Sequence, residues 1–375
     1  MKPKIDFKFL AGLLVGAVVV GVAVFLLTGG DDDKDSKTTS DGSTIHPVET
    51  GDDDQGKEGE NGGAQGGEEL SLPVPEGGGK IKCPGATKTV GDTEALKSAL
   101  AQAKPGDVIR MNAGTYTGTF TAKTSGTKDQ PIYLCGDASA VIDGGGVKKG
   151  YGFHLDGANY WRLIGFTVKN SQKGVIGDTT NGSIIQGLTV HDIGDEAIHL
   201  RKFSTGNTVQ YNKIYNTGLR REKFGEGVYL GSAESNWGNV TGGKPDKSDN
   251  NVVRGNVIRA TAEAIDIKEG TTGGKILNNV FDGSRTGGDK HNDSWVDVKG
   301  NNYLLEGNKG TKTPVDGFQT HEILDGWGKG NIFRNNTITL AGGSGVGIND
   351  VKGGNTISCD NKVTDGKLTK KGACS

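Results

Sequence analysis

Short segments that alternate apolar, polar and apolar residues recur along the second half of the chain. Six of them follow this pattern or a close variant of it, at residues 198–200, 228–230, 265–267, 296–298, 318–320 and 346–348. Alternation with a period of two is typical of strands with one face toward a core and one toward water. Self-similarity at about 22–30 residues indicates one supersecondary unit stacked many times. The pattern therefore predicts a solenoid of short strands.

A column of asparagines marks one position in successive units. Each follows an apolar residue by three positions, except in the last unit, where Ser358 takes that place; the asparagines are Asn212, Asn256, Asn279, Asn308, Asn336 and Asn361. Stacked asparagine side chains can satisfy turn backbone groups and bond to one another from coil to coil. Together with the strands, this column predicts an all-β fold, a parallel β-helix.

The start of the folded part adds a helix to this solenoid. Residues 92–103 predict a short helix with Asp92 or Thr93 as its N-cap and with Leu96 and Leu100 as its apolar stripe. Residues 107–111 follow as a strand. This region, with the stretch PGDVIRMNAGTYTG, resembles the right-handed parallel β-helix superfamily of pectate-lyase-like proteins. The resemblance covers roughly residues 85–365. It implies a right-handed, single-stranded β-helix with a capping helix over its open end and an asparagine ladder between the second and third strands of each coil.

Composition agrees with a turn-rich solenoid and excludes one class of partner. The 375 residues include 65 glycines and only 6% aromatic residues, which is typical of such folds. The net charge of −2 carries no signature of nucleic-acid binding. We therefore expect no nucleic-acid partner, and we expect a monomer.

The four cysteines are Cys83, Cys135, Cys359 and Cys374. None lies in a CxxC pair, which disfavours a zinc site. Pairs between Cys83 and Cys135 and between Cys359 and Cys374 would staple the two ends of the solenoid, where such folds need protection. Two disulfides would also indicate an oxidising compartment.

The N-terminal sequence supports export. Three lysines precede an apolar run at residues 9–27, whose length lies between that of a signal peptide and that of a transmembrane helix. We predict a signal anchor or a cleaved signal peptide at 1–28, a disordered, acidic, glycine-rich linker at 29–80, and the β-helix domain at 81–375. The protein would then be extracellular, either secreted or tethered to the cell surface through a transmembrane segment.

In the polysaccharide lyases of this superfamily, the face of the first strand and its flanking loops form the substrate cleft. Three outward rows follow from the repeat. The row before the strand contains Glu196, Glu226, Glu263, Ser294, Asp316 and Ser344. The middle row contains His199, Tyr229, Asp266, Asp297, Gln319 and Gly347. The row after the strand contains Arg201, Gly231, Lys268, Lys299, His321 and Asn349. Acids and lysines thus gather in the central coils.

One coil is much longer than the others, because Asn212 and Asn256 are 44 residues apart. The added segments, 219–224 and 232–249, would flank the charged centre as walls, and long loops inside a regular solenoid are usually functional. Three basic residues there, Arg220, Arg221 and Lys223, would attract an anionic chain. Two aromatic residues would be available to stack on a sugar ring, Tyr229 and Trp237.

The charged centre suits β-elimination of a uronic-acid polymer, an acidic polysaccharide. This reaction needs a cation near the sugar carboxylate, a base for the C5 proton and help for the leaving oxygen. Repulsion between Lys268 and Lys299 on adjacent coils, about 3 kcal/mol at an intermediate dielectric, would lower a lysine pKa. Asp266 and Asp297 oppose that shift unless a metal occupies them. Ca²⁺ takes six to eight oxygen ligands and would relieve the repulsion between carboxylates. Its candidate ligands are Asp266, Asp297, Glu263 and Glu226.

The same residues resemble the calcium-dependent, lysine-based lyases of β-helix fold. That resemblance implies Lys268 as the base, Lys299 as the second candidate, and Arg201 or His321 as the group that holds a carboxylate or assists the leaving group. The RxPxxR segment of the commonest pectate lyases is missing, and SWVDVKG matches their WIDH strand only in part. The paired aspartates, GHG and RIK of polygalacturonases are also missing, which disfavours their hydrolytic scheme.

Three alternatives stay open. Alternating Asp and Lys on a sheet face can be simple cross-strand ion pairs. The same scaffold could carry a uronan epimerase or a glycoside hydrolase, the latter with two suitably spaced carboxylates. A non-catalytic surface solenoid that binds carbohydrate or acts as an adhesin is the third.

Overall fold

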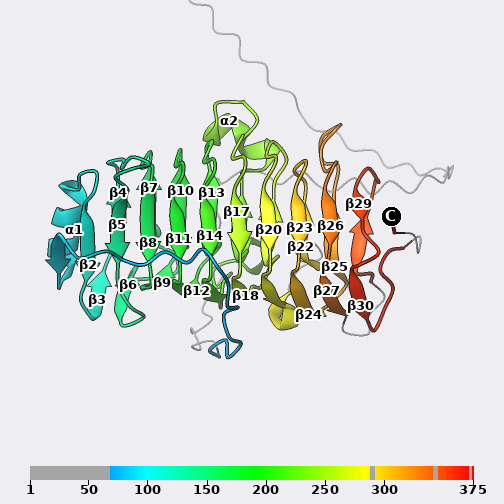
Figure 1. Cartoon of the computed structure of the whole chain (residues 1–375), viewed down its shortest axis with the longest axis horizontal. Coiled ribbons are helices and arrows are strands. Elements are labelled where there is room, and N and C mark those ends of the chain that lie inside the picture. The colour runs from blue at the N-terminus through cyan, green and yellow to red at the C-terminus, as the bar shows by residue number, and fades with distance from the viewer. Residues whose placement is uncertain (1–67, 288–291, 341–344, 371–373) are drawn as a thin grey trace, which may run out of the picture. The chain divides into compact units, whose positions relative to one another are not determined.

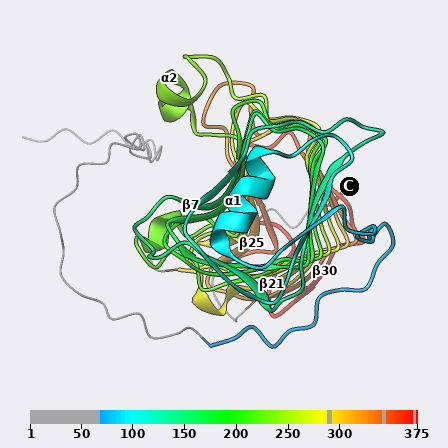
Figure 2. The same cartoon turned by 90° about the vertical axis from the view of Figure 1, so that its left-hand side faces the viewer.

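The computed structural model describes residues 68–287, 292–340, 345–370 and 374–375. Within this part of the chain, parallel strands form three sheets that wrap around one core, coil after coil, as a β-helix (Figures 1 and 2). Each complete coil contributes one strand to sheet 1, then one to sheet 2, then one to sheet 3. The predicted all-β, parallel β-helix fold is confirmed.

The strand bounds in the described residues are as follows. Sheet 1 consists of β4 (Phe120–Ala122), β7 (Tyr151–Asp156), β10 (Lys173–Asp178), β13 (Ile198–Arg201), β16 (Val228–Leu230), β19 (Ile265–Ile267), β22 (Ser294–Val298), β25 (Asp316–Thr320) and β28 (Ile348–Asp350). Sheet 2 consists of β1 (Lys88–Val90), β2 (Val108–Met111), β5 (Ile132–Cys135), β8 (Trp161–Ile164), β11 (Ile184–Gln186), β14 (Thr208–Gln210), β17 (Val252–Arg254), β20 (Lys275–Leu277), β23 (Leu304–Glu306), β26 (Ile332–Arg334) and β29 (Thr356–Ile357). Sheet 3 consists of β3 (Gly114–Thr117), β6 (Ala140–Asp143), β9 (Thr167–Ser171), β12 (Thr189–Ile193), β15 (Lys213–Tyr215), β18 (Val257–Arg259), β21 (Val280–Asp282), β24 (Lys309–Thr313), β27 (Thr337–Leu340) and β30 (Lys362–Thr364).

The strand register in sheet 1 agrees with the predicted rows except in the last coil. Tyr229 pairs with Asp266, and Asp266 pairs with Asp297. In β28, however, Asn349 pairs with Gln319, where the prediction placed Gly347. That prediction is wrong by two residues. Apolar residues stand at both 346 and 348, so a pattern with a period of two fits both registers equally well. Ser344 lies outside the described residues.

The asparagine ladder is confirmed in the turn between sheets 2 and 3. From Asn212 to Asn336, each side-chain amide donates to the next asparagine's Oδ1, at 2.9 Å from Asn212 to Asn256 and at 3.0 Å from Asn256 to Asn279. The same amides also donate to backbone carbonyls inside the turn, such as that of Val209, at 3.0 Å from Asn256. The ladder is fully buried along most of its length. It therefore fixes the stacking of the coils.

Further asparagine contacts, not predicted from the sequence, lie in the turn between sheets 1 and 2. The Asn207 amide donates to Asn251 Oδ1 at 3.1 Å, and Asn181 donates to Asn159 Oδ1 at 3.0 Å. The spacing of these residues is less regular, since serine and threonine share the turn. A repeat defined by one asparagine per coil therefore does not reveal these residues.

The N-terminal end is covered by α1 (Thr93–Ala101), which lies across the open solenoid (Figure 2). The Asp92 side chain accepts a hydrogen bond from the Ala95 amide, and Leu96 and Leu100 are buried, as predicted. Both predicted disulfides, Cys83–Cys135 and Cys359–Cys374, are present. The ends of the solenoid are thus closed by a helix and by covalent bonds.

Residues 68–83 are extended and run along the outside of the coils (Figure 1). Leu70 is 1% exposed and packs with Tyr215 and Val257. The Ile81 amide donates to Gln186 Oε1 at 2.8 Å. Residues 68–80 belong to the predicted linker, yet they lie against the solenoid. The apolar run at 9–27 and the linker at 29–67 fall outside the described residues. Among the described residues, no helix is long and apolar enough to cross a membrane.

Candidate active site

The outward face of sheet 1 brings most of the predicted charged centre together. Asp266 points outward because it alternates with the core residues Ile265 and Ile267. The backbone ladder continues beyond the strands, since the Lys268 amide donates to Leu230 O at 2.9 Å and the Lys299 amide donates to Ile267 O at 2.8 Å. The lysines therefore keep the row spacing of the sheet beside the acids.

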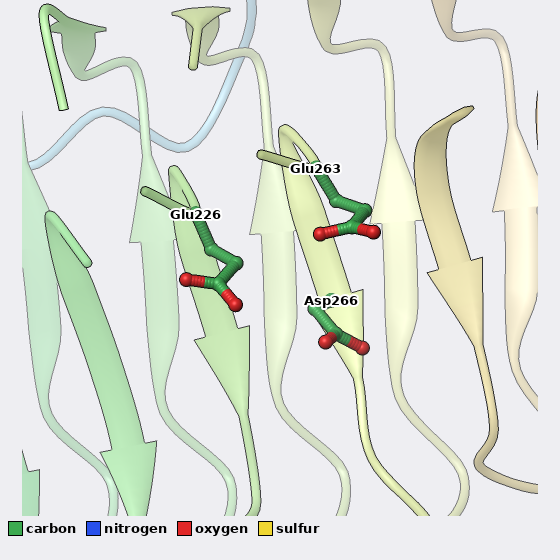
Figure 3. A group of neighbouring side chains, drawn as sticks. All are labelled: Glu226, Glu263 and Asp266. Carbon is green, nitrogen blue, oxygen red and sulfur yellow. The ribbon is translucent and has the colours of Figure 1, made fainter. Parts of the chain in front are cut away.

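Three carboxylates form a compact buried cluster (Figure 3). Glu226 and Glu263 come from the turns before β16 and β19, Asp266 lies in β19, and one oxygen of each lies within 4.8 Å of the others. Burial, followed by repulsion from Glu196 and Glu263, raises the pKa of Glu226 well above its usual value. Burial, Asp297 and Asp266 do the same for Glu263. Oxygen donors of this kind suit a hard cation such as Ca²⁺.

One carboxylate oxygen of the cluster is left without a partner in the described part of the chain and could bind a metal ion. Among the described residues, Glu226 Oε2 is buried and has no hydrogen-bond partner. An unpaired buried carboxylate oxygen is costly, and a cation would relieve that cost. Glu226, Glu263 and Asp266 thus fit a calcium site.

The lysines are paired with the aspartates. Lys268 Nζ lies 3.0 Å from Asp266 Oδ2, and Lys299 Nζ lies 3.0 Å from Asp266 Oδ1 and 3.1 Å from Asp297 Oδ2. Burial alone would lower the pKa of Lys299, but Asp266 and Asp297 outweigh it and raise that pKa above its usual value. The lowering expected from lysine–lysine repulsion is therefore not found at Lys299. This residue is an ammonium clamp between two acids.

Asp297 faces cations rather than the carboxylate cluster. It lies 3.5 Å from His321 Nε2 and accepts from Ser294 Oγ at 3.1 Å, besides its contact with Lys299. Burial opposes its ionisation, yet Lys299 and His321 hold its pKa below the usual value. His321 Nε2 also lies 2.7 Å from Gln319 Oε1. Of the four predicted calcium ligands, Asp297 is the one that the structure leaves outside the three-carboxylate group.

A small cavity, hereafter the polar cavity, opens beside this cluster. Its volume is about 40 Å³, and its lining consists of Glu196, His199, Arg201, Phe224, Glu226, Tyr229, Ser232, Asn236 and Val240. Lys268 Nζ stands 5.1 Å from the centre of the Tyr229 ring. Tyr229 therefore connects the predicted base to the cavity.

Arg201 is held rigidly at the edge of the polar cavity. Its Nε donates to Asp178 Oδ1 at 2.8 Å and its Nη2 donates to Tyr151 Oη at 3.1 Å. Burial alone would lower the pKa of Arg201, but Asp178 outweighs it and raises that pKa. His154 Nε2 contacts the other oxygen of Asp178 at 3.1 Å. Arg201 was predicted from the sequence, whereas Asp178 and Tyr151 were not, because they lie on strands without a regular charge pattern.

His199 supports Tyr229. Its Nε2 donates to Gly231 O at 2.8 Å, and its ring meets the Tyr229 ring edge-on at 4.3 Å between centroids. Burial lowers the pKa of His199, which favours the neutral ring. Gly231 has φ 82°, and an added Cβ would lie 2.5 Å from Thr271 Cγ2, so only glycine fits this bend.

A buried ion pair beside His199 was also missed. Lys173 Nζ lies 3.0 Å from Glu196 Oε1, and both residues are buried. Burial alone would raise the pKa of Glu196, but Lys173 and His199 hold it below its usual value. Lys173 occupies the row position before Glu196, so extending the row by one coil would have found it.

The long coil places its residues differently from the prediction. Arg220 forks onto Asp195, with Nη2 to Oδ2 at 2.6 Å, and it lines a separate cavity of about 440 Å³ with Leu219, Glu222 and Arg285. It does not reach the polar cavity. Two other basic residues in this loop, Arg221 and Lys223, are exposed and flank Phe224.

Trp237, which begins α2 (Trp237–Val240), is buried in its own loop. It is only 8% exposed, and its Nε1 donates to Ser232 O at 3.0 Å. The structure thus does not offer its ring as a stacking surface for a sugar. The ring instead forms the core of the 232–249 loop, which large aromatic residues often do because they bury much apolar area.

Comparisons with known proteins agree with this architecture. The family described as "Pel9A-like, right handed beta helix region" matches residues 82–228. Pectate lyase L of Dickeya chrysanthemi is 28% identical over 145 residues, which is 35% of this chain and 32% of that protein, so the chain spans about a third of this relative.

Solved structures extend the match. The structure of an alginate lyase from Paenibacillus sp. str. FPU-7 is 36% identical, with a TM-score of 0.71, over 76% of this chain and 98% of that one. The pectate lyase Pel9A, 16% identical with a TM-score of 0.55 over 78% of this chain and 82% of that one, shares the fold. The chain therefore belongs to the right-handed parallel β-helix superfamily of pectate-lyase-like proteins, among its polysaccharide lyases.

Proposed function

We propose that this protein cleaves a uronic-acid polysaccharide by β-elimination, and that alginate is the first substrate to test. The observation that carries this proposal is the position of Lys268, which contacts Asp266 and the Tyr229 ring at the edge of the polar cavity. The similarity to an alginate lyase over nearly all of that protein supports the choice of substrate. The two disulfides favour action outside the cell.

In this mechanism, Lys268 Nζ acts as the base. It removes the C5 proton of the uronate, the C–H electrons form the C4–C5 double bond, and the bond from C4 to the glycosidic oxygen breaks. Asp266, 3.0 Å from Nζ, orients the amine and stabilises the ammonium that forms. Lys299 is a weaker candidate, because its two carboxylate partners keep it protonated.

The substrate carboxylate needs positive charge close by, because charge develops on it as the proton leaves. Glu226, Glu263 and Asp266 would hold Ca²⁺, which would supply such charge when bound. Among the side chains, Lys299 and Arg201 are fixed cations on either side of Tyr229, each held in place by an aspartate. They would orient an anionic chain along sheet 1.

The leaving oxygen needs a proton. The groups that line the polar cavity and carry an exchangeable proton include the Tyr229 hydroxyl and the Arg201 guanidinium. Arg201 already donates to Asp178 and Tyr151, so we assign the proton to the Tyr229 hydroxyl. His199, which packs against the Tyr229 ring, positions it.

The test is an ultraviolet assay for the unsaturated uronate on alginate, pectate and glucuronan, with Ca²⁺ and with a chelator. We expect absorbance to rise on at least one polymer and the rise to vanish in Lys268→Ala. Lys275→Ala, an exposed lysine on sheet 2, serves as the matched control. New reducing ends without unsaturated product would instead indicate hydrolysis. Binding without any product would indicate a carbohydrate-binding or adhesive solenoid.

A further inference from the structure

Unpaired hydrogen-bond acceptors gather at the polar cavity. Glu196 Oε2, Glu226 Oε2 and Asn236 Oδ1 are buried and have no hydrogen-bond partner among the described residues. All three residues line this one cavity. Leaving a buried polar group unpaired is costly for the folded state. Glu226 Oε2 belongs to the candidate calcium site, so Glu196 Oε2 and Asn236 Oδ1 are the acceptors left in this wall for a hydrogen-bond donor.

The size of the cavity limits its occupant. Its volume of about 40 Å³ exceeds the roughly 10–15 Å³ that one water molecule needs, so a small polar group can enter. A single hydroxyl group fits this space. A sugar ring bound over sheet 1 would direct one of its hydroxyls into this space.

The charges around the cavity favour a neutral donor over a second cation. Lys173 already neutralises Glu196 at 3.0 Å, and the Arg201 guanidinium lines the same space. Lys268 stands behind the Tyr229 ring. Positive side chains thus stand beside Glu196, and an additional cation would be repelled there. A sugar hydroxyl donates a hydrogen bond without adding charge.

The loop that carries Asn236 is fixed in place. Asn236 ends η2 (Glu234–Asn236), and the Glu234 amide donates to Glu269 Oε1 at 2.6 Å. Farther along, Asp246 accepts from Ser232 Oγ at 2.8 Å and from the Phe203 amide at 2.9 Å. These bonds tie both ends of the loop to neighbouring coils. The Asn236 acceptor is therefore preorganised over the cavity.

We propose that the polar cavity binds a free hydroxyl of the uronate presented to Lys268, so that the enzyme selects unsubstituted polymers and rejects O-acylated ones. This inference rests on the proposed lyase function and adds a specificity determinant, Asn236 with Glu196, to it. An ester at that hydroxyl removes the donor, leaves Glu196 Oε2 and Asn236 Oδ1 unpaired and adds bulk at the cavity. A sulfate ester would in addition bring negative charge toward Glu196 and Glu226.

The experiment compares one alginate preparation in two forms, O-acetylated and chemically de-esterified, with the full-length protein. We expect kcat/KM to be about 10-fold or more higher on the de-esterified form, since sites built around a hydroxyl discriminate strongly. Asn236→Ala should lower kcat/KM on the de-esterified form about 10-fold and narrow the ratio between the two forms. Asn239→Ala, an exposed residue of α2 in the same loop, should leave both values unchanged.

Equal cleavage of both forms by the wild type, or an unchanged ratio in Asn236→Ala, would overturn the proposal. A binding titration of Lys268→Ala with the two forms separates the two proposals. If no polymer gives unsaturated product, the lyase proposal fails, and the titration alone decides the hydroxyl site. Tighter binding of the de-esterified form, lost in the double variant with Asn236→Ala, supports it, and equal binding refutes it.

Discussion

Two regions of this solenoid bury stacked polar side chains, and they do so in opposite ways. In the asparagine ladder, one residue type repeats, and every amide from Asn212 to Asn336 donates to the next asparagine, as from Asn279 to Asn308 at 3.0 Å. On sheet 1, the three rows differ, with Glu before the strand, Tyr and Asp in the middle and Lys after it. Buried oxygens there, such as Glu226 Oε2, have no hydrogen-bond partner among the described residues.

The difference separates stability from function. A row of identical, fully bonded amides contributes to folding and has no capacity left for a ligand. A row of mixed charges with unpaired acceptors is less favourable for folding and has capacity for a substrate or a cation. We therefore expect variants in the ladder to change mainly stability and variants on sheet 1 to change mainly activity.

The largest effect should come from Tyr229→Phe. Removing the hydroxyl takes away the proposed acid but keeps the ring that packs against His199. We expect kcat to fall about 10³-fold, within the usual contribution of a general acid, while thermal stability stays near that of the wild type. Steady-state kinetics and a melting curve check this. A loss in stability with kcat preserved would mean that Tyr229, like the ladder asparagines, has a structural role and no role in the reaction.

The sequence predicted the fold well because its signals are repetitive. The alternation around Asp266, the asparagine column and the cap of α1 each follow from local rules, and the structure confirms them. The last coil was misplaced because a period of two does not distinguish registers that differ by two residues. Repetition thus fixes the architecture and leaves the register of single coils open.

The site was harder to predict because its contacts join residues that are far apart in the sequence. Spacing places Lys268 and Lys299 on adjacent coils, but only the side-chain geometry shows that both contact Asp266. Arg220 and Trp237 were assigned to the substrate from their residue type and loop. Their partners, Asp195 and Ser232 O, are set by the path of a long loop that no periodicity describes.

The next largest effect should come from the ladder itself. Asn279→Ala removes the acceptor of both Asn256 amides and a donor to Val253 O, so buried groups lose their partners. We expect the free energy of unfolding to fall by about 3 kcal/mol with little change in kcat of the folded enzyme. Urea denaturation measures the loss, with the exposed Asn112→Ala as control. An unaffected midpoint would mean that the ladder does not stabilise the coils.

A third, smaller effect should appear in the pH dependence of stability. Glu226 and Glu263 have raised pKa values in the folded state, above an ordinary value of 4.5, so the folded chain binds protons more tightly than the unfolded chain. The resulting stability is present below the unfolded pKa and is lost as pH rises through the folded values. With a chelator, the free energy of unfolding should therefore fall as pH rises above about 4.5, by at most about 1.4 kcal/mol per pH unit and group.

Calcium and a single substitution should each flatten that slope. Ca²⁺ would bind the ionised carboxylates and offset the loss at high pH. Glu226→Gln removes one of the titrating groups and should make the pH dependence of the free energy of unfolding less steep. Asn279→Ala, in a region without charge, should lower the free energy of unfolding by the same amount at every pH. An identical slope with and without Ca²⁺ would argue that protons alone, and no cation, neutralise the cluster.

The smallest effect should come from charges that belong to neither region. Arg221 and Lys223 are exposed on η1 (Glu222–Phe224) and its N-terminal flank, beside the Phe224 edge of the polar cavity. Salt screens the attraction between exposed charges and an anionic polymer. The double variant Arg221→Ala, Lys223→Ala should therefore raise KM about threefold at low salt and hardly at all at high salt. Removing two exposed lysines at the far end, Lys104→Ala with Lys128→Ala, changes the net charge equally and should leave KM unchanged. If both double variants raise KM alike, net charge attracts the polymer and the loop has no particular role. If only the loop variant does, attraction is local to the cleft, and the region that binds the chain extends from the buried rows to their exposed rim.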